Sequence, residues 1–188
     1  MAENSIRADS EVAHDVQEGD AESFGILVHR WELPMRRYAR RFLSGYDQIE
    51  SAVQDVFIKA YENINSYNHE RPFSPWLYRL AHNEFIDILR KEKRSPVAFI
   101  DFDTILPHAA APETADGDSL AQELVGELGE LLEELNPKYR EPIVLHYYEG
   151  FAYKDIADIL KIPIGTVGIR IKRGRDRLRS LINSDQHV

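Results

Sequence analysis

The 188-residue chain contains no cysteine. Disulfides, thiolate metal sites and cysteine nucleophiles are therefore excluded, and a reducing compartment is compatible with the sequence. No run of about 18 apolar residues, the length that would cross a membrane, occurs anywhere in the chain. The start, Met1 to Asp15, is polar and acidic and lacks the basic and apolar stretches of a signal peptide. We therefore expect a cytoplasmic protein that does not insert into a membrane.

Motifs for common enzyme chemistry are also missing. The sequence has no Gly-rich phosphate loop, no H-E-x-x-H pair and no nucleophile elbow. Its 7 histidines never recur at a spacing of three or four, which argues against a metal site on a helix. The sequence therefore predicts a protein that is not an enzyme, with no catalytic residue, no metal site, no cofactor and no small-molecule substrate.

Positive charge is scarce but concentrated. Lys and Arg number 23 against 32 Asp and Glu, and a net charge of −9 speaks against nonspecific attraction to nucleic acid. Between Arg94 and Lys138, however, every charged residue is acidic, and the basic residues cluster elsewhere. The clusters are Arg36 to Arg41, Arg90 to Arg94 and Arg170 to Arg179. Because charge acts locally, within a Debye length, these clusters are candidates for contact with a polyanion.

Apolar residues recur at helical spacing over two parts of the chain. The first part includes Leu27 and Trp31, and the second restarts at Leu120 and breaks at Asn136 and Pro137. The prolines and small residues between the two parts show no helical or strand period. The sequence predicts an all-α fold of two small helical domains: an N-terminal tail over 1–19, a domain over 20–94, a flexible acidic linker over 95–118 and a domain over 119–184.

The segment from Tyr153 to Leu181 has the layout of a helix-turn-helix, in which two short helices meet at a tight turn. We place the turn at Ile162 and Pro163. An apolar stripe lies on the first helix and continues on the second at spacings of four and seven. Its members are Ile156, Ala157, Leu160, Val167, Ile171 and Leu178.

The other faces of the second helix are predicted to be cationic. They carry Arg170, Lys172, Arg173, Arg175, Arg177 and Arg179 against a single acid, Asp176. A helix with one apolar and one cationic face can enter a DNA major groove, where Arg binds guanine edges and Lys or Arg binds phosphate. A solvated basic helix end and a membrane-surface helix are the alternatives. The preceding turn favours DNA binding.

These segments resemble the bacterial extracytoplasmic-function sigma factors. The segments LNPKYREPIVLHYYEGFAYKDIADIL and GTVGIRIKRGRDRLR look like region four of that family, which binds the minus-thirty-five element. In the N-terminal half, AESFGILVHRW and YARRF are similar to the first conserved helix, and VQDVFIKAYENINSY is similar to the polymerase-binding helix. The minus-ten segment is matched by RPFSPWLYRLAHNEFIDILRKEKR. The resemblance implies a promoter-specificity subunit that binds core RNA polymerase and directs transcription initiation.

For the minus-ten element, the resemblance implies a pocket for a flipped base, formed by the loop from Tyr67 to Pro75 and the helix that carries Asn83. Aromatic faces and cations suit this task, because unstacked bases need both. Trp76, Leu77 and Leu80 are more simply explained as core residues, and Asn83 could instead satisfy backbone groups. The implied DNA contacts are Tyr67, Arg71, Phe73, Arg79, Asn83, Arg90, Lys91, Lys93 and Arg94.

For the polymerase, the resemblance implies that the clamp coiled coil binds one polar helix side. Its residues are Glu50, Gln54, Asp55 and Lys59. We assign the opposite side to the core, with Val53, Val56, Phe57 and Ala60. The C-terminal domain would bind the polymerase flap. Family members are commonly held inactive by an anti-sigma factor, which is a further expected partner.

For the minus-thirty-five element, the implied contacts are Thr166, Ile169, Arg170, Lys172, Arg173 and Arg175. Gly168 and Ile169 replace the basic and hydroxyl residues that frequently follow G-T-V in the family, which predicts an unusual upstream element. The main alternative is a stand-alone helix-turn-helix regulator. That alternative would leave the aromatic and basic N-terminal segment without a role.

Overall fold

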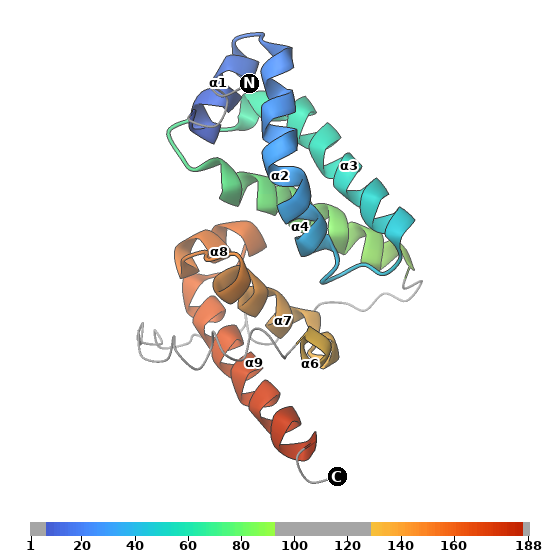
Figure 1. Cartoon of the computed structure of the whole chain (residues 1–188). Coiled ribbons are helices and arrows are strands. Elements are labelled where there is room, and N and C mark those ends of the chain that lie inside the picture. Colours follow the sequence, from blue (N-terminus) through green and yellow to red (C-terminus); the bar gives the residue numbers. More distant parts are fainter. Residues whose placement is uncertain (1–6, 93–128, 186–188) are drawn as a thin grey trace. The chain divides into compact units, whose positions relative to one another are not determined.

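The computed structural model describes residues 7–92 and 129–185, and every regular element in these ranges is a helix (Figure 1). The chain divides into two compact units, and each described range belongs to one of them. The predicted all-α fold with two helical domains is confirmed. No helix in the described ranges is both long and apolar enough to cross a membrane. The predicted linker over 95–118 and the helical pattern that restarts at Leu120 lie outside these ranges.

The N-terminal unit is a bundle whose helices pack through their apolar faces. Its elements are α1 (Asp9–Gln17), η2 (Ala21–Ser23), α2 (Phe24–Ala39), α3 (Tyr46–Glu62), η3 (Ile64–Ser66) and α4 (Phe73–Glu92). α2, α3 and α4 pack against one another and bury Leu27, Tyr38, Val56 and Phe85 completely or almost so. The side of α3 that the sequence assigns to the core is buried in the structure at Val53, Val56, Phe57 and Ala60.

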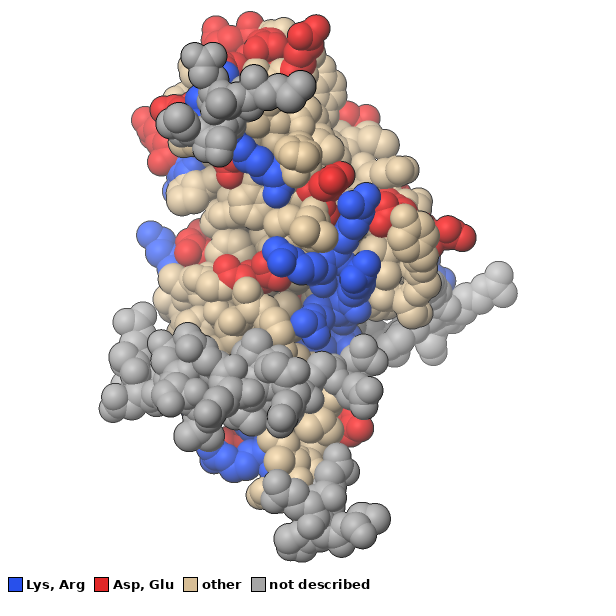
Figure 2. Space-filling view, viewed as in Figure 1, with Lys and Arg blue, Asp and Glu red and all other residues tan. Residues whose placement is uncertain are grey.

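α1 lies within the segment that the sequence analysis treats as an N-terminal tail, and this is a correction. The helix packs against α2, η3 and α4, and it buries Val12, Ala13 and Val16. Three buried apolar residues in a polar, acidic segment give too weak a periodic pattern to predict a helix from the sequence. Acidic side chains gather where α1 leads into η2, at one end of this unit (Figure 2). The first domain therefore begins at α1.

The C-terminal unit is a second small bundle. Its elements are α6 (Gly129–Glu134), α7 (Pro137–Ile143), the π-helical turn η5 (Val144–Tyr148), α8 (Tyr153–Leu160) and α9 (Ile164–Asp185). The predicted break at Asn136 and Pro137 is confirmed: Asn136 caps α7 by accepting a hydrogen bond from the backbone N–H of Lys138 at 3.1 Å. Leu132, Leu135, Ile143 and Leu178 form the core cluster.

A glycine lies at a tight contact between α7 and α9. Gly174 lies on the buried side of α9, and a Cβ atom there would lie 2.5 Å from Ile143 Cδ1 and 3.3 Å from the Tyr139 carbonyl oxygen. An L side chain fits that space only if the buried Ile143 side chain shifts. Gly165, near the start of the same helix, has no atom within 4 Å of its Cβ position.

Replacing Gly174 with valine is expected to destabilise the C-terminal unit by about 2 kcal/mol, the usual cost of overpacking a core. Urea unfolding monitored by circular dichroism would measure the loss. Gly165→Ala is the control, which should be neutral or slightly stabilising because alanine favours helix. A Gly174→Val protein as stable as the wild type would contradict this tight contact at Gly174.

Candidate nucleic-acid interface

The C-terminal unit contains the predicted helix-turn-helix. α8 ends at Leu160, Lys161 adopts a left-handed conformation (φ 56°), and α9 begins at Ile164. Two hydrogen bonds fix this turn: the Ile162 N–H donates to the Ala157 carbonyl at 3.2 Å, and the Thr166 N–H donates to the Pro163 carbonyl at 2.9 Å. The turn at Ile162 and Pro163 is therefore confirmed. The sequence analysis expects a short second helix, and this is corrected: α9 runs for 22 residues.

Two of the residues expected to contact DNA from α9 are buried. Thr166 is 5% exposed and Arg170 is 9% exposed, so both lie on the side that packs against the unit. Burial lowers the pKa of Arg170 from its ordinary value. The expectation that Arg170 lies on the cationic side is corrected. It falls three residues after Val167 and one before Ile171, both fully buried or nearly so, within a wide apolar stripe.

Three other candidates on α9 remain open to solvent. Lys172, Arg173 and Arg175 are exposed, and we call them the basic face; Ile169 is partly exposed beside them. Arg175 donates a hydrogen bond to the Tyr147 hydroxyl at 3.3 Å, which directs its side chain along the surface of η5. A short row of cations thus lies in the middle of α9, which begins at Ile164 and is the second helix of the helix-turn-helix, the helix that enters a DNA groove in proteins with this motif.

In the N-terminal unit, the aromatic candidates pack against one another. Tyr67 and Phe73 are 4% and 3% exposed, and their ring centroids lie 5.4 Å apart in a T-shaped arrangement. Trp76 stands 5.3 Å from Tyr67 and 5.4 Å from Phe73. The three rings support the loop from its buried side, and they expose too little of their faces for a base to stack on them. Trp76 and Leu77 are core residues, as the simpler explanation held.

Tyr67 also closes the loop that follows it. Its hydroxyl donates to the Arg71 carbonyl, and the Arg71 N–H donates back to the Asn68 carbonyl at 3.0 Å. Burial, with a smaller contribution from Asp9, raises the pKa of Tyr67 to about 12. The phenol is therefore protonated at neutral pH and can act as the donor.

Polar candidates line one side of α4. Arg79, Asn83 and Arg90 follow one another at spacings of four and seven, which places them on one helix face. Asn83 and Arg90 are exposed and Arg79 is partly exposed; Arg71 and Lys91 are exposed as well. Arg90 forms an exposed ion pair with Asp87 at 3.1 Å. Lys93 and Arg94, predicted for the same interface, lie outside the described residues.

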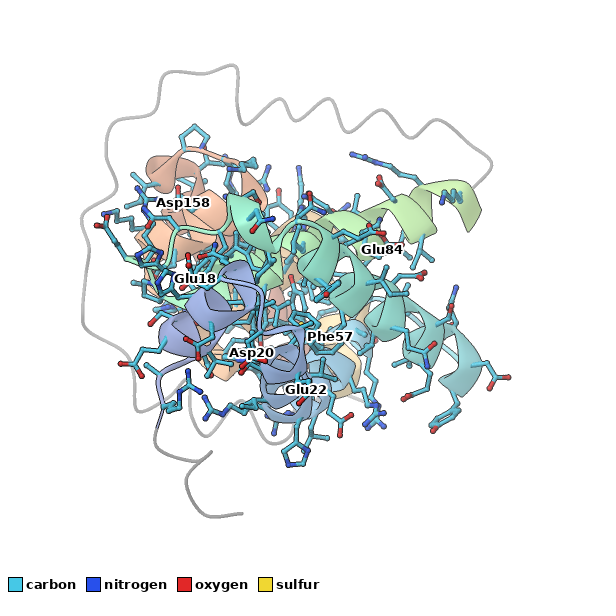
Figure 3. All side chains as sticks on the ribbon, turned by 90° about the horizontal axis from the view of Figure 1, so that it is seen from above. Glu18, Asp20, Glu22, Phe57, Glu84 and Asp158 are labelled. Atoms are coloured by element: carbon cyan, nitrogen blue, oxygen red, sulfur yellow. The ribbon has the colours of Figure 1, made fainter. Side chains whose placement is uncertain are left out.

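On α3, two of the predicted polymerase contacts hold the domain together. Glu50 accepts two hydrogen bonds from Arg36 of α2, at 2.8 and 2.9 Å. Lys59 forms an ion pair with Glu84, which lies on the part of α4 that runs beside α3 (Figure 3). The sequence predicts Arg36 only as part of a cluster that contacts a polyanion and predicts no role for Glu84, because both ion pairs depend on which helices meet. Gln54 is exposed and Asp55 partly so.

Replacing Lys59 with methionine is expected to destabilise the N-terminal unit by about 1–3 kcal/mol, because it leaves the carboxylate of Glu84, only 8% exposed, without its cation. The hydrogen bond to Glu84 raises the pKa of Lys59 above the ordinary 10.5. The stabilisation is therefore complete below that ordinary value and is lost as the pH rises through the raised one. Urea unfolding at several pH values should show a constant difference between wild type and variant up to about pH 10 and a smaller one above.

The double variant Lys59→Met/Glu84→Leu is the control for this ion pair. An apolar pair often replaces a buried ion pair without loss of stability, so the second substitution should recover most of the loss. Equal stabilities of wild type and the Lys59→Met variant at pH 7 would contradict a stabilising role.

The sequence and the fold of this chain are similar to those of known proteins. Two family models match the chain: Sigma-70 region 2 over residues 27–95 and Sigma-70, region 4 over residues 126–178. The ECF RNA polymerase sigma factor SigW of Bacillus subtilis is 35% identical over 175 residues, which are 87% of this chain and 91% of SigW.

Two solved structures are similar over nearly their full lengths. One is CnrH in complex with the cytosolic domain of CnrY, with a TM-score of 0.70, 26% identity and coverage of 95% of this chain and 99% of that one. The other is the sigma factor RpoE in complex with the anti-sigma factor NepR from Bartonella quintana, with a TM-score of 0.64, 28% identity and coverage of 87% and 99%.

The order of the two matched regions is the order of the two helical units. The region 2 match covers most of α2 and all of α3 and α4, and the region 4 match covers the helix-turn-helix as far as residue 178. The chain therefore belongs to the extracytoplasmic-function sigma factors of the sigma-70 family, the non-enzymatic subunits that direct RNA polymerase to promoters and start transcription.

Proposed function

We propose that the two units divide promoter recognition between them, the C-terminal unit binding the minus-thirty-five element and the N-terminal unit binding the minus-ten element. The observation that carries this proposal is the basic face of α9, which is exposed on the second helix of a helix-turn-helix. A chain with a net charge of −9 gains little from nonspecific attraction to DNA, so its cations must act where they are concentrated.

At the minus-thirty-five element, Lys172, Arg173 and Arg175 would bind base edges and phosphates, and Ile169 would meet a thymine methyl group. Thr166 and Arg170, being buried, would act by fixing the orientation of α9. Because Gly168 offers no side chain, bases opposite it would be bound less selectively. This is the proposed basis of an unusual upstream element.

At the minus-ten element, the minus-ten loop, defined as residues 67–75, and the exposed face of α4 would hold unstacked bases. Asn83 suits a base edge because its amide offers both a donor and an acceptor. Arg71, Arg79, Arg90 and Lys91 would hold the backbone of the nontemplate strand, as would Lys93 and Arg94. Tyr67 and Phe73 would contribute indirectly, by supporting the loop from its buried side.

Core polymerase would contact the exposed part of α3 around Gln54 and Asp55 through its clamp, and the C-terminal unit through its flap. Glu50 and Lys59 would contribute mainly by fixing α3 to α2 and α4, given their ion pairs. RpoE, 28% identical to this chain, is bound to the anti-sigma factor NepR. We propose that an anti-sigma factor also binds this protein and covers its polymerase-binding surfaces, and that the protein acts in the cytoplasm with its polymerase.

The absence of cysteine provides a direct test of this division. A single introduced thiol can carry an iron chelate that cleaves nearby DNA, and Arg179→Cys and Glu70→Cys place one at an exposed position in each unit. With the holoenzyme on a mapped promoter, the Arg179 probe should cut around the minus-thirty-five element and the Glu70 probe around the minus-ten element. Wild type treated with the reagent should give no cuts. Reversed positions, or cuts by both probes at one element, would contradict the proposal.

A further inference from the structure

The end of α1 is hydrogen-bonded to the start of the minus-ten loop. The side-chain amide nitrogen of Gln17 donates to the carbonyl oxygens of Ile64 and Tyr67, both at 2.8 Å. A glutamine amide has two N–H donors, and both are used here. Only the nitrogen end of the amide can face two carbonyl oxygens, so no other orientation of Gln17 satisfies this site.

The first part of the loop, residues 67–71, is tied together by hydrogen bonds. The Tyr67 hydroxyl donates to the carbonyl of Arg71, and the Glu70 N–H donates to the Asn68 side chain at 2.9 Å. Because the turn is tied back to Tyr67, holding the carbonyl of Tyr67 holds the turn. Gln17 therefore holds the residue to which this part of the loop is hydrogen-bonded.

A second contact joins α1 to the same loop. The imidazole rings of His14, on α1, and His69, in the loop, lie with their centroids 4.5 Å apart and their planes tilted by 39°. Both residues are exposed, so this contact lies on the surface and is independent of the buried apolar side of α1. Two separate side chains of one helix thus reach one loop.

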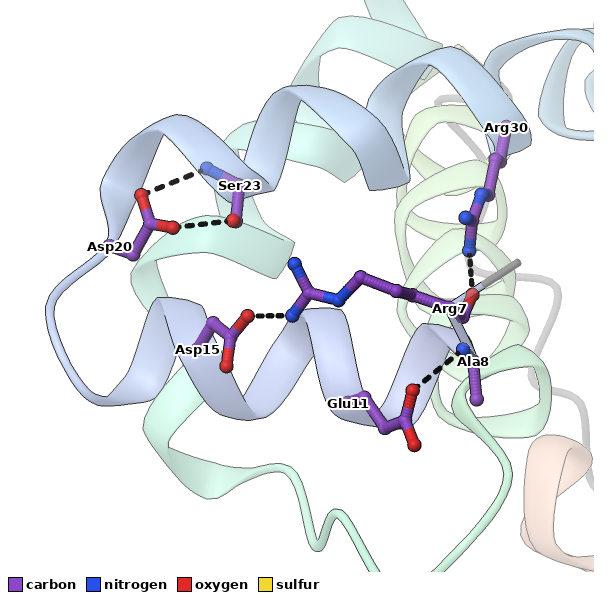
Figure 4. Close-up of polar contacts among 7 residues, drawn as sticks. All are labelled: Arg7, Ala8, Glu11, Asp15, Asp20, Ser23 and Arg30. Atoms are coloured by element: carbon purple, nitrogen blue, oxygen red, sulfur yellow. Dashed lines mark hydrogen bonds and ion pairs between the residues drawn. The ribbon is translucent and has the colours of Figure 1, made fainter. Parts of the chain in front are cut away.

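α1 is itself fixed to α2 at its other end. Arg30 of α2 donates to the Asp9 carboxylate and to the Arg7 carbonyl, each at 2.7 Å, and the Trp31 indole N–H donates to the same carboxylate at 3.0 Å. Figure 4 shows Arg30 reaching the Arg7 carbonyl, with Arg7 paired to Asp15 and Glu11 capping the helix start. Because α1 is bonded to α2 at one end and to the loop at the other, it can fix the position of the loop relative to α2.

We propose that α1 is a brace for the minus-ten loop and that Gln17 is its positioning residue, fixing the loop in the geometry that discriminates minus-ten bases. α1 lies before residue 27, where the region 2 match begins, so the match itself assigns it no role. The inference rests on the proposed binding of the minus-ten element by this loop. A purely structural role would alter stability and polymerase affinity without a change in base discrimination, whereas a positioning role lowers base discrimination while polymerase affinity is kept.

The test compares transcription by holoenzyme from a mapped promoter with transcription from the same promoter carrying single minus-ten substitutions. The ratio of the two rates is the discrimination ratio. Gln17→Leu keeps the size of the side chain and removes both donors, so it should lower this ratio by about tenfold, the scale of losing two ordinary hydrogen bonds. Core affinity should be nearly unchanged, and the melting temperature should fall only as far as the loss of two hydrogen bonds requires. Glu18→Ala, an exposed change at the end of the same helix, should keep the wild-type ratio.

His14→Ala provides the same test from an exposed position, and should lower the ratio by about twofold, the scale of one weak surface contact. It keeps the inference testable if Gln17→Leu fails to fold. Wild-type discrimination in His14→Ala and in a folded Gln17→Leu protein would overturn the brace, as would parallel losses of core affinity and melting temperature without a change in the ratio. If the wild type itself does not discriminate between minus-ten bases, the proposed function of the loop fails instead.

Discussion

Transcription from a mapped promoter is expected to fall by roughly a hundredfold when Lys172 and Arg173 are both replaced with alanine, because each good base or phosphate contact contributes about 1–3 kcal/mol. Both side chains are exposed on α9, so the substitutions should leave the unfolding free energy of the C-terminal unit nearly unchanged. Run-off transcription with saturating sigma factor would measure the loss, and fluorescence anisotropy would show whether affinity for core polymerase is retained.

The matched control removes the same two charges elsewhere in the unit. Lys154→Ala/Arg179→Ala changes two other exposed cations and should retain the wild-type dependence on the minus-thirty-five sequence. The Lys172→Ala/Arg173→Ala protein, in contrast, should no longer respond when that sequence is replaced. If both double variants responded to the sequence as the wild type does, the basic face would not be the recognition surface.

Asn83→Ala is expected to reduce open-complex formation by about tenfold or more, because the loss of both a donor and an acceptor at a base edge costs about 1–3 kcal/mol. Asn83 is exposed on α4, so its replacement removes no core contact. Permanganate reactivity of thymines at the minus-ten element would report strand opening, while a footprint upstream would show whether the minus-thirty-five element remains bound.

Asn183→Ala is the matched control for Asn83, since Asn183 is also exposed but lies near the end of α9. It should open the promoter as the wild type does. Normal opening by the Asn83→Ala protein, across promoters with different minus-ten bases, would show that Asn83 satisfies only local groups. That was the alternative left open by the sequence.

The helix-turn-helix could be predicted from sequence because local signals agree there. The apolar stripe through Val167, Ile171 and Leu178 has helical spacing, and Pro163 stands just before the helix that it helps to start. These residues are buried as expected. Family membership decides the wider question, since it excludes a stand-alone regulator and an enzyme.

The remaining site could not be predicted because it depends on which helices meet. Arg170 looks like a surface cation in the sequence, but the width of the buried stripe on α9 includes it. Tyr67 and Phe73 look available for stacking, yet their rings are used by each other and by Trp76. Gln17 carries no signal at all, because its partners are carbonyl groups 47 and 50 residues further along the chain.

The most direct test is transcription by sigma-free core RNA polymerase on a fragment library of the source genome, with start sites mapped with and without this protein. New start sites that share two spaced elements, and that are lost with Asn83→Ala or with Lys172→Ala/Arg173→Ala, are the predicted result. No core binding and no new start sites, together with tight binding of duplex DNA by the protein alone, would contradict the account.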